Sequence, residues 1–314
     1  MKDQVDDRMR YRKLFSIQKM STLLRNCFIL MVIVFFPSPS FSGVLFEERL
    51  SYSVAKGDTL STVGAYFGTD LKRLARENNL DPSTPLKAGR KLRISTTKII
   101  PETMQNGILI DVPGRMLYFF EGGAPIMAFP VGLGMPKGEG EKGWETPSGK
   151  FTIKGKLKSP DWKVPKSIQE EMKREGLAVK ESYPPGPKNP VGGYVLLTTL
   201  PGILIHETID PLSINKYLSH GCVRVMRDDM EQLFDSSGAG VSGEIVYAPI
   251  KLASRSDGRV FMEVNKDIYE NVKDMQAEAR RLIEKAGLLD SVDMNKVVKI
   301  TREQKGIPED ITVK

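Results

Sequence analysis

The chain is poor in the side chains that most often carry chemistry. Its 314 residues include two cysteines, two histidines and two tryptophans. Cys27 lies in an apolar N-terminal run, whereas Cys222 lies in a short segment that also holds both histidines, His206 and His220. Two histidines leave no obvious zinc site, so we expect no metal and no cofactor. A single cysteine outside the N-terminal run excludes an internal disulfide, so Cys222 needs another reason to be present.

The N-terminal apolar run is too short to cross a membrane. Residues 27–36 supply ten apolar positions, whereas a transmembrane helix needs about 20. A basic segment precedes this run and small residues follow it, which is the layout of a secretory signal. We predict a signal peptide over residues 1–42, cut between Ser42 and Gly43, as the only segment that meets a membrane. An uncleaved anchor is the alternative.

Positive charge is modest outside that segment. The whole chain has 46 Lys and Arg residues and 39 Asp and Glu residues, of which residues 1–42 hold seven and three. The remainder therefore has 39 basic and 36 acidic side chains, a net charge of +3. A nucleic-acid-binding protein would need a denser basic face, so we expect no nucleic-acid partner. A mild positive balance suits an anionic cell-wall polymer. The remaining length allows one large domain and a small one.

Residues 52–95 have the pattern of a small β-α-α-β unit. Gly57 and Asp58 form a turn, Asp58 or Thr59 would cap the first helix, and Gly68 would end it. This unit resembles a lysin motif (LysM). The resemblance lies in the run Gly57-Asp58-Thr59-Leu60, in the pair Phe67-Gly68 and in the spacing of Leu86, Gly89 and Leu92. This resemblance implies binding to N-acetylglucosamine-containing glycans of peptidoglycan. The candidate contact residues are Gly57, Asp58, Thr59 and Asn79, while most other residues of the motif would only build the fold.

The pattern after residue 105 is that of a mainly β domain. Residues 95–105 are expected to be a linker. Strands are predicted at 108–112, 115–120, 126–131, 194–198, 202–206, 223–225, 245–247 and 260–264, with a short helix from Asp228 to Phe234. The expected fold is a β-sandwich-like domain with mixed strands and short helices over residues 104–250. A C-terminal extension, residues 251–314, would pack on it, with one helix predicted within 266–287.

Residues 154–192 are rich in Pro and Lys and only weakly periodic. Long segments without regular structure are often lids over a site or disordered. We expect this segment to cover the cleft, with Trp162 closing over the substrate.

Cys222 is the candidate nucleophile. It follows Gly221 in a tight turn, Ser219–Cys222, and glycine lets the backbone turn beside a nucleophile without a Cβ clash. An imidazole within reach can take the thiol proton and give a thiolate paired with a histidinium. The spacing does not decide between His206 and His220 as that base. Arg224 is two residues further on and shares a strand face with Cys222, so it could hold a substrate carboxylate through two hydrogen bonds; a surface ion pair is the alternative.

This region resembles the signature of the L,D-transpeptidase catalytic family. The resemblance lies in Ile205-His206 and in the later segment Ser219-His220-Gly221-Cys222-Val223-Arg224. Thr146-Pro147-Ser148-Gly149 adds to this resemblance. It implies that Cys222 is the nucleophile and His206 the base, steadied by the backbone carbonyl of Glu207. It also implies that His220 and the amides of Gly221 and Cys222 shape the oxyanion region, beside Ser219. The chain has His206-Glu207-Thr208 where the family commonly has His-Gly-Thr, and this departure lies on the acceptor side.

The implied reaction is acyl transfer within peptidoglycan. Cys222 would attack the carbonyl of the third residue of a stem peptide and release D-Ala. An amine would then resolve the thioester, either from a second stem peptide (a 3→3 cross-link) or from a wall-attached lipoprotein. Water as acceptor would make the protein an L,D-carboxypeptidase. A non-catalytic peptidoglycan-binding protein is the rival from another class. A papain-like endopeptidase is disfavoured because no histidine follows Cys222.

Overall fold

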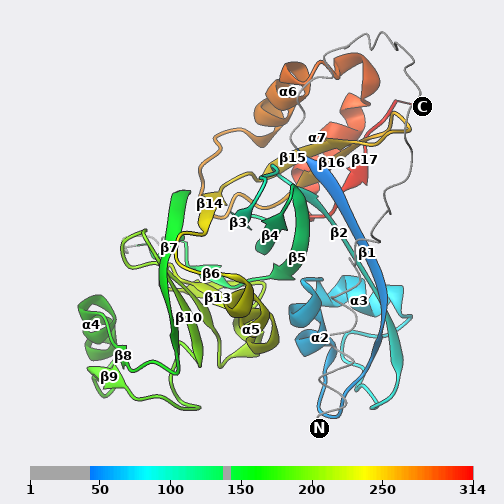
Figure 1. Cartoon of the computed structure of the whole chain (residues 1–314). Helices are drawn as coiled ribbons and strands as arrows, with labels where there is room; N and C mark the ends of the chain where they lie inside the picture. Colours follow the sequence, from blue (N-terminus) through cyan, green and yellow to red (C-terminus); the bar gives the residue numbers. More distant parts are fainter. Residues whose placement is uncertain (1–42, 137–142, 314) are drawn as a thin grey trace, which may run out of the picture.

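The computed structural model describes residues 43–136 and 143–313, which form three units (Figure 1). The predicted signal peptide therefore lies outside the described residues. Within the described ranges, no helix is both long and apolar enough to cross a membrane.

The N-terminal unit has the expected β-α-α-β order. Its elements are β1 (Val44–Ser53), α2 (Leu60–Phe67), α3 (Leu71–Glu77) and β2 (Lys91–Ile100). Thr59 caps α2 by accepting a hydrogen bond from the backbone N–H of Thr62, and Gly68 ends this helix in the left-handed conformation. The apolar faces of both helices pack on the β1–β2 hairpin in a small core of their own.

The expected linker over residues 95–105 is wrong in its first half. Residues 95–100 continue β2, because β1 pairs antiparallel with β2 along the full ten residues, from Ser53 opposite Lys91 to Val44 opposite Ile100. The end of this hairpin is buried, with Ile99 and Ile100 fully covered. The N-terminal unit therefore continues as a strand up to Ile100, and residues 101–106 form the loop that connects it to β3.

The central unit is the mainly β domain that the sequence predicts. Eight strands form one sheet in the order β13-β11-β10-β7-β14-β3-β4-β5. Their bounds are β3 (Gly107–Asp111), β4 (Met116–Glu121), β5 (Ala124–Pro130), β7 (Gly149–Lys158), β10 (Tyr194–Thr198), β11 (Leu204–Glu207), β13 (Val223–Val225) and β14 (Ser242–Val246). The pairs β11–β13 and β14–β3 are parallel and the others antiparallel, so the sheet is mixed as expected.

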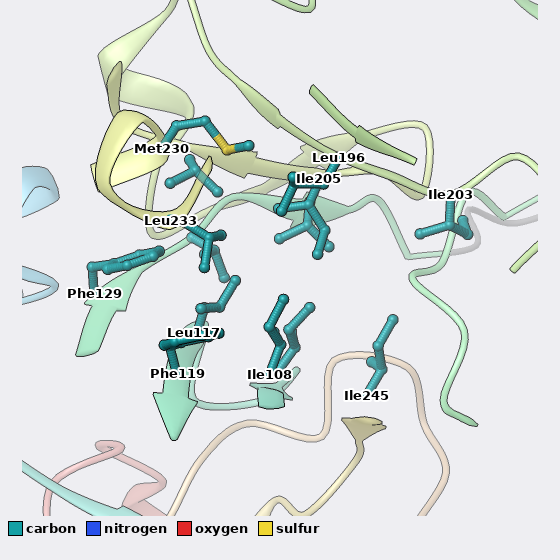
Figure 2. Packing of buried hydrophobic residues seen from close by; sticks show 14 of the residues in the cluster. Ile108, Leu117, Phe119, Phe129, Leu196, Ile203, Ile205, Met230, Leu233 and Ile245 are labelled. Atoms are coloured by element: carbon teal, nitrogen blue, oxygen red, sulfur yellow. The ribbon is translucent and has the colours of Figure 1, made fainter. Parts of the chain in front are cut away.

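The two halves of this sheet pack face to face. Figure 2 shows Ile108, Leu117 and Phe119 from β3 and β4 opposite Leu196 and Ile205 from β10 and β11. The helix α5 (Arg227–Ser236), predicted from Asp228 to Phe234, closes one side of this core with Met230 and Leu233. A short parallel pair, β6 (Leu133–Gly134) with β12 (Tyr217–Ser219), and the 3₁₀ turn η1 (Pro211–Ser213) lie at the edge.

The C-terminal extension is a third unit with its own core. It contains β15 (Ile250–Ser254), β16 (Val260–Val264), α6 (Met275–Lys285), η2 (Leu289–Ser291), α7 (Met294–Glu303) and β17 (Glu309–Asp310). The single helix predicted within 266–287 is shorter than expected. Asp274 accepts hydrogen bonds from the N–H groups of Gln276 and Ala277 and so fixes the start of α6, which leaves Ile268 and Val272 in the preceding loop.

Residues 154–192 are more ordered than the sequence suggests. They contain the end of β7, the short pair β8 (Trp162–Lys163) and β9 (Ser182–Tyr183), and the helix α4 (Lys166–Arg174). These elements project together at the far end of the central unit from the C-terminal helices (Figure 1). Every residue of α4 remains at least partly exposed, including Ile168 and Met172, the two apolar residues one turn apart on its surface.

Candidate active site

The parallel strands β11 and β13 present the candidate catalytic residues on one face. Ile205 pairs with Val223 and His206 with Arg224. Ile205 and Val223 point into the core, so alternation places His206 and Arg224 on the opposite face. Cys222 directly precedes β13 and is two residues from Arg224, which puts it on that same side. The resulting site lies on the outer surface of a well-packed sheet.

The Cys222 thiol is half-buried and is held at the end of β11. Its Sγ accepts a hydrogen bond from the backbone N–H of Leu204 at 3.4 Å and donates one to the carbonyl oxygen of Gly202 at 3.5 Å. Burial raises the pKa of this thiol above its ordinary value, while the Leu204 N–H and the Arg224 charge act in the opposite direction. The resting side chain is therefore a thiol.

His206 is buried and its tautomer follows from its partner. Its Nδ1 lies 2.7 Å from the carbonyl oxygen of Glu207. A carbonyl can only accept, so Nδ1 carries the hydrogen and the neutral ring has its lone pair on Nε2. Burial lowers the pKa of His206 to about 4, opposed by the Glu207 carbonyl and assisted by the Arg224 charge. His206 is thus a neutral ring near pH 7.

These two pKa directions disfavour a resting thiolate–histidinium pair, the state that the sequence suggested for the nucleophile. Burial favours the neutral form of both Cys222 and His206. The geometry instead fits a base that takes the proton during the reaction.

The turn before Cys222 is held by hydrogen bonds to its backbone. The Ser219 hydroxyl donates to the carbonyl oxygen of Cys222 at 2.5 Å, and the Thr146 hydroxyl donates to that of Gly221 at 3.0 Å. Gly221 has φ +99°, and a Cβ there would lie 3.1 Å from the side chain of Ile203. The positive φ favours glycine here, and the close Ile203 side chain adds to this preference. Thr146 comes from the Thr-Pro-Ser-Gly segment, which gives that segment a structural role at the site.

The C-terminal unit also supports this turn. The Tyr269 hydroxyl donates to the carbonyl oxygen of Gly134 at 2.8 Å and accepts from the backbone N–H of Thr146 at 3.2 Å. Its ring stacks on that of Tyr247. The sequence of the extension carries no motif that points to this role, because an isolated tyrosine gives no signal that it will contact another unit.

His220 is held by two residues that sequence reasoning missed. Its Nε2 contacts Oε2 of Glu171 at 2.5 Å, and its ring lies edge-on to that of Trp144 with centroids 4.8 Å apart. Glu171 lies on α4, so the segment 154–192 reaches the site through this carboxylate. Trp162, the tryptophan proposed from the sequence, packs against Tyr183 in the β8–β9 pair.

Arg224 and Glu207 have different surroundings. Arg224 is half-buried and, among the described residues, forms no ion pair, so its guanidinium is available beside Cys222. The Glu207 side chain is buried, accepts a hydrogen bond from the backbone N–H of Gly193 at 2.8 Å and lies 3.5 Å from Arg227. The side chain of Glu207 therefore ties the end of the 154–192 segment to β11, while its carbonyl orients His206.

Among the four candidate glycan-binding residues, two have side chains that make hydrogen bonds within the fold and two lie at turns. The Asp58 carboxylate accepts hydrogen bonds from the Tyr52 hydroxyl and the Ala55 N–H, and Thr59 caps α2. Gly57 and Asn79 lie at turns with φ +92° and +53°. Asp58 and Thr59 thus hold the turn at Gly57, while Asn79 lies in the turn after α3.

The described residues contain no group of three or more His, Cys, Asp and Glu side chains arranged to hold a metal ion. The fold places three side chains with reactive or charged groups on this face of the sheet, those of Cys222, His206 and Arg224. A thiol, a neutral imidazole and a fixed cation on one face of a sheet can perform nucleophilic acyl transfer on a substrate that carries a carboxylate.

Comparisons with known proteins agree with both resemblances seen in the sequence. The L,D-transpeptidase catalytic domain (YkuD) matches residues 105–246, and the LysM domain matches residues 52–95. Among curated proteins, the probable L,D-transpeptidase ErfK/SrfK of Escherichia coli is 26% identical over 89% of this chain and 91% of its own length. The probable L,D-transpeptidase YcfS of the same organism is 26% identical over 75% of this chain and 73% of its own length.

Solved structures give a more distant likeness. An L,D-transpeptidase from Mycobacterium tuberculosis is 13% identical, with a TM-score of 0.33, over 67% of this chain and 96% of its own length. The C442S mutant of the Enterococcus faecium L,D-transpeptidase is 17% identical, with a TM-score of 0.33, over 46% of this chain and 50% of its own length.

Proposed function

We propose that this protein, which belongs to the L,D-transpeptidase family through residues 105–246, acts on peptidoglycan with Cys222 as its nucleophile and His206 as its base. One observation carries the assignment of roles. The Nδ1 of His206 is committed to the Glu207 carbonyl, which leaves the lone pair of Nε2 on the face that Cys222 and Arg224 share.

The first half-reaction follows from the neutral state of both groups. Nε2 of His206 takes the Cys222 proton as Sγ attacks the carbonyl between the third stem residue and D-Ala. A tetrahedral oxyanion forms and collapses to a thioester. The carbon–nitrogen bond breaks, and the imidazolium returns the proton to the amine of the departing D-Ala. Proton and leaving group are balanced without a cofactor.

The second half-reaction reverses the roles. An acceptor amine attacks the thioester while Nε2 of His206 takes its proton, and the sulfur leaves as a thiolate that recovers this proton. The acceptor amine belongs to a second stem peptide, which gives a 3→3 cross-link, or to a wall-attached lipoprotein. Water at the same step gives a carboxypeptidase. The Arg224 guanidinium holds a stem carboxylate beside the sulfur.

Glu171 positions His220 in this scheme. A carboxylate only accepts hydrogen bonds, so the contact fixes a hydrogen on Nε2 of His220 and sets the plane of its ring against Trp144. With the turn held by Ser219 and Thr146, His220 and the amides of Gly221 and Cys222 then form the oxyanion region. The Glu171 contact links α4 to this region.

The LysM unit holds the enzyme on glycan strands, through the turns at Gly57 and Asn79. We place the protein outside the inner membrane, in the periplasm or cell wall, after removal of residues 1–42. A substrate built of peptidoglycan and a glycan-binding unit both require that location.

Product analysis tests the function. Purified disaccharide-tetrapeptide is incubated with the protein, and the muropeptides are separated by chromatography and identified by mass. We expect cross-linked dimers that have lost D-Ala, and none with Cys222→Ala. Products that retain both D-Ala residues, or equal products from the variant, would contradict the proposal. A tripeptide alone would identify water as the acceptor.

A further inference from the structure

A crevice of about 820 Å³ lies where the three units of the chain meet. One wall is the N-terminal unit, with α3 and the end of β2, and another is Arg115 and Asn215 of the central unit. The third wall comes from the C-terminal unit, near Lys266 and Lys305. The crevice is separate from Cys222 and from the predicted glycan-binding turns, none of which lines it.

The charge of this crevice is strongly positive. Seven Lys and Arg residues line it against three Asp and Glu residues, an excess of four positive charges. Residues 43–314 as a whole carry an excess of only three. The rest of those residues is therefore close to neutral, and the positive charge of the chain beyond its signal segment is concentrated here.

Several of these cations are free to bind a ligand. Among the described residues, Lys72, Arg76 and Lys266 form no ion pair, and all three are exposed at the crevice. They come from two different units, Lys72 and Arg76 from α3 and Lys266 from the segment after β16. Like charges gathered from separate parts of a chain repel one another, so their convergence costs stability unless an anion is bound between them.

The backbone around the crevice is also unusual. Six non-glycine residues of the described chain have positive φ, and three of them line this one crevice: Arg115 at +52°, Asn215 at +60° and Gln304 at +45°. Arg115 and Asn215 are fixed to each other by a hydrogen bond of 2.7 Å between Nε and Oδ1. Gln304 ends α7 as its left-handed cap and asparagine tolerates this conformation, so Arg115 is the strained position of the three.

We propose that this crevice binds the carboxylates of peptidoglycan stem peptides on a strand that the LysM unit holds. The proposal rests on the proposed function, because it takes peptidoglycan as the substrate. The crevice gives the enzyme a second, charge-dependent contact with the wall, distinct from the binding of sugar by the LysM turns and from the binding of the reacting stem by Arg224.

The position of the crevice favours this ligand over a small free anion. Helix α2 packs against η1 and β5 of the central unit, so the LysM unit is docked directly beside the catalytic sheet. A strand that lies along the LysM unit can therefore extend its peptides over the crevice. Most of the lining residues are polar or charged, with Ile307 as the large apolar side chain among them, whereas sites for small organic ligands are mostly apolar.

The test uses a triple variant, Lys72→Ser/Arg76→Ser/Lys266→Ser, in a Cys222→Ala background so that the wall is not modified. Binding to purified sacculi is measured by sedimentation at low and high salt. Sacculi whose carboxylates have been converted to amides serve as the substrate without carboxylate charge. We expect the triple variant to bind native sacculi at least five-fold more weakly at low salt, and to bind amidated sacculi as tightly as its parent does.

A matched control removes three exposed cations that do not line the crevice, in Arg49→Ser/Lys91→Ser/Lys285→Ser. This control should bind native sacculi like its parent. Equal loss in both triple variants, or equal binding of the parent to native and amidated sacculi, would overturn the proposal.

Two further measurements separate this proposal from the proposed function. Binding of an uncharged N-acetylglucosamine oligomer should be unchanged in the crevice variant, which shows that the LysM unit is intact. With Cys222 restored, the same three substitutions should leave turnover of a soluble tetrapeptide unchanged. If the soluble tetrapeptide is not turned over by any form, the proposed function fails, while the comparison on sacculi still decides whether the crevice binds carboxylates.

Discussion

His206 should titrate far below an ordinary histidine. Burial lowers its pKa from 6.5 to about 4. Between these two values the unfolded chain binds a proton that the folded chain does not, so stability falls as the pH falls through this window. At about 1.4 kcal/mol for each pH unit, a difference of about 2.5 units amounts to about 3 kcal/mol. This contribution is fully present above pH 6.5 and is lost by about pH 4.

The chain is well suited to measuring this value because it has only two histidines. With labelled imidazole rings, NMR should show two signals, and His220→Gln assigns them. We expect the His206 signal to remain that of the Nδ1–H tautomer down to about pH 4. In parallel, the free energy of unfolding of the wild type should fall by about 3 kcal/mol more than that of His206→Gln between pH 6.5 and 4.

The result has a direct bearing on the mechanism. If His206 stays neutral, the base remains available in mild acid, and its contribution to kcat/KM should be lost near pH 4 instead of near 6.5. A His206 signal that titrates at or above 6.5 would refute the reasoning, since it would mean a histidinium stabilised at rest by a thiolate.

Two further predictions concern Glu171 and Lys251. Glu171→Gln removes the charge that holds His220, so kcat should fall about ten-fold or more while the rate of thiol alkylation changes little. Substitution of the neighbouring exposed residue, Glu170→Gln, is the control and should leave both rates as in the wild type. Equal effects of the two substitutions would contradict the positioning role of Glu171. The Nζ of Lys251 lies 2.5 Å from the buried carboxylate of Asp111 and 2.9 Å from that of Glu263. Lys251→Met removes this shared cation, so chemical denaturation should show that the free energy of unfolding falls by about 3–5 kcal/mol. A fall below about 1 kcal/mol would show that these two ion pairs are not needed for stability.

Local sequence signals predicted the parts of the fold that depend on local chemistry. The cap at Thr59 and the end of α2 at Gly68 follow from the capping preferences of those residue types. Strands such as Tyr194–Thr198 and Val223–Val225 follow from short apolar runs. The carbonyl that orients His206 was implied by the resemblance to the family, and the structure places it at hydrogen-bond distance.

Contacts between distant segments could not be predicted in the same way. Helix α4 buries none of its residues in a core and has only Ile168 and Met172 as apolar residues, so its sequence does not show where it docks. Its Glu171 reaches His220 across 49 positions of the chain. The sequence pointed to Trp162 because it lies in the Pro- and Lys-rich segment, whereas in the folded chain Trp144 contacts His220. Tyr269 reaches Gly134 from another unit. Such contacts depend on how units dock, which no local pattern encodes.

The most direct test of the account is the mass of the covalent intermediate. The protein is mixed with a stem tetrapeptide without an acceptor amine, quenched in acid and examined by intact-protein and peptide mass spectrometry. We predict an adduct equal to the tetrapeptide minus D-Ala, located on Cys222 and absent from Cys222→Ala, with free D-Ala released in equal amount. An adduct on another residue, or D-Ala release that persists in Cys222→Ala, would contradict the assignment of Cys222 as the nucleophile.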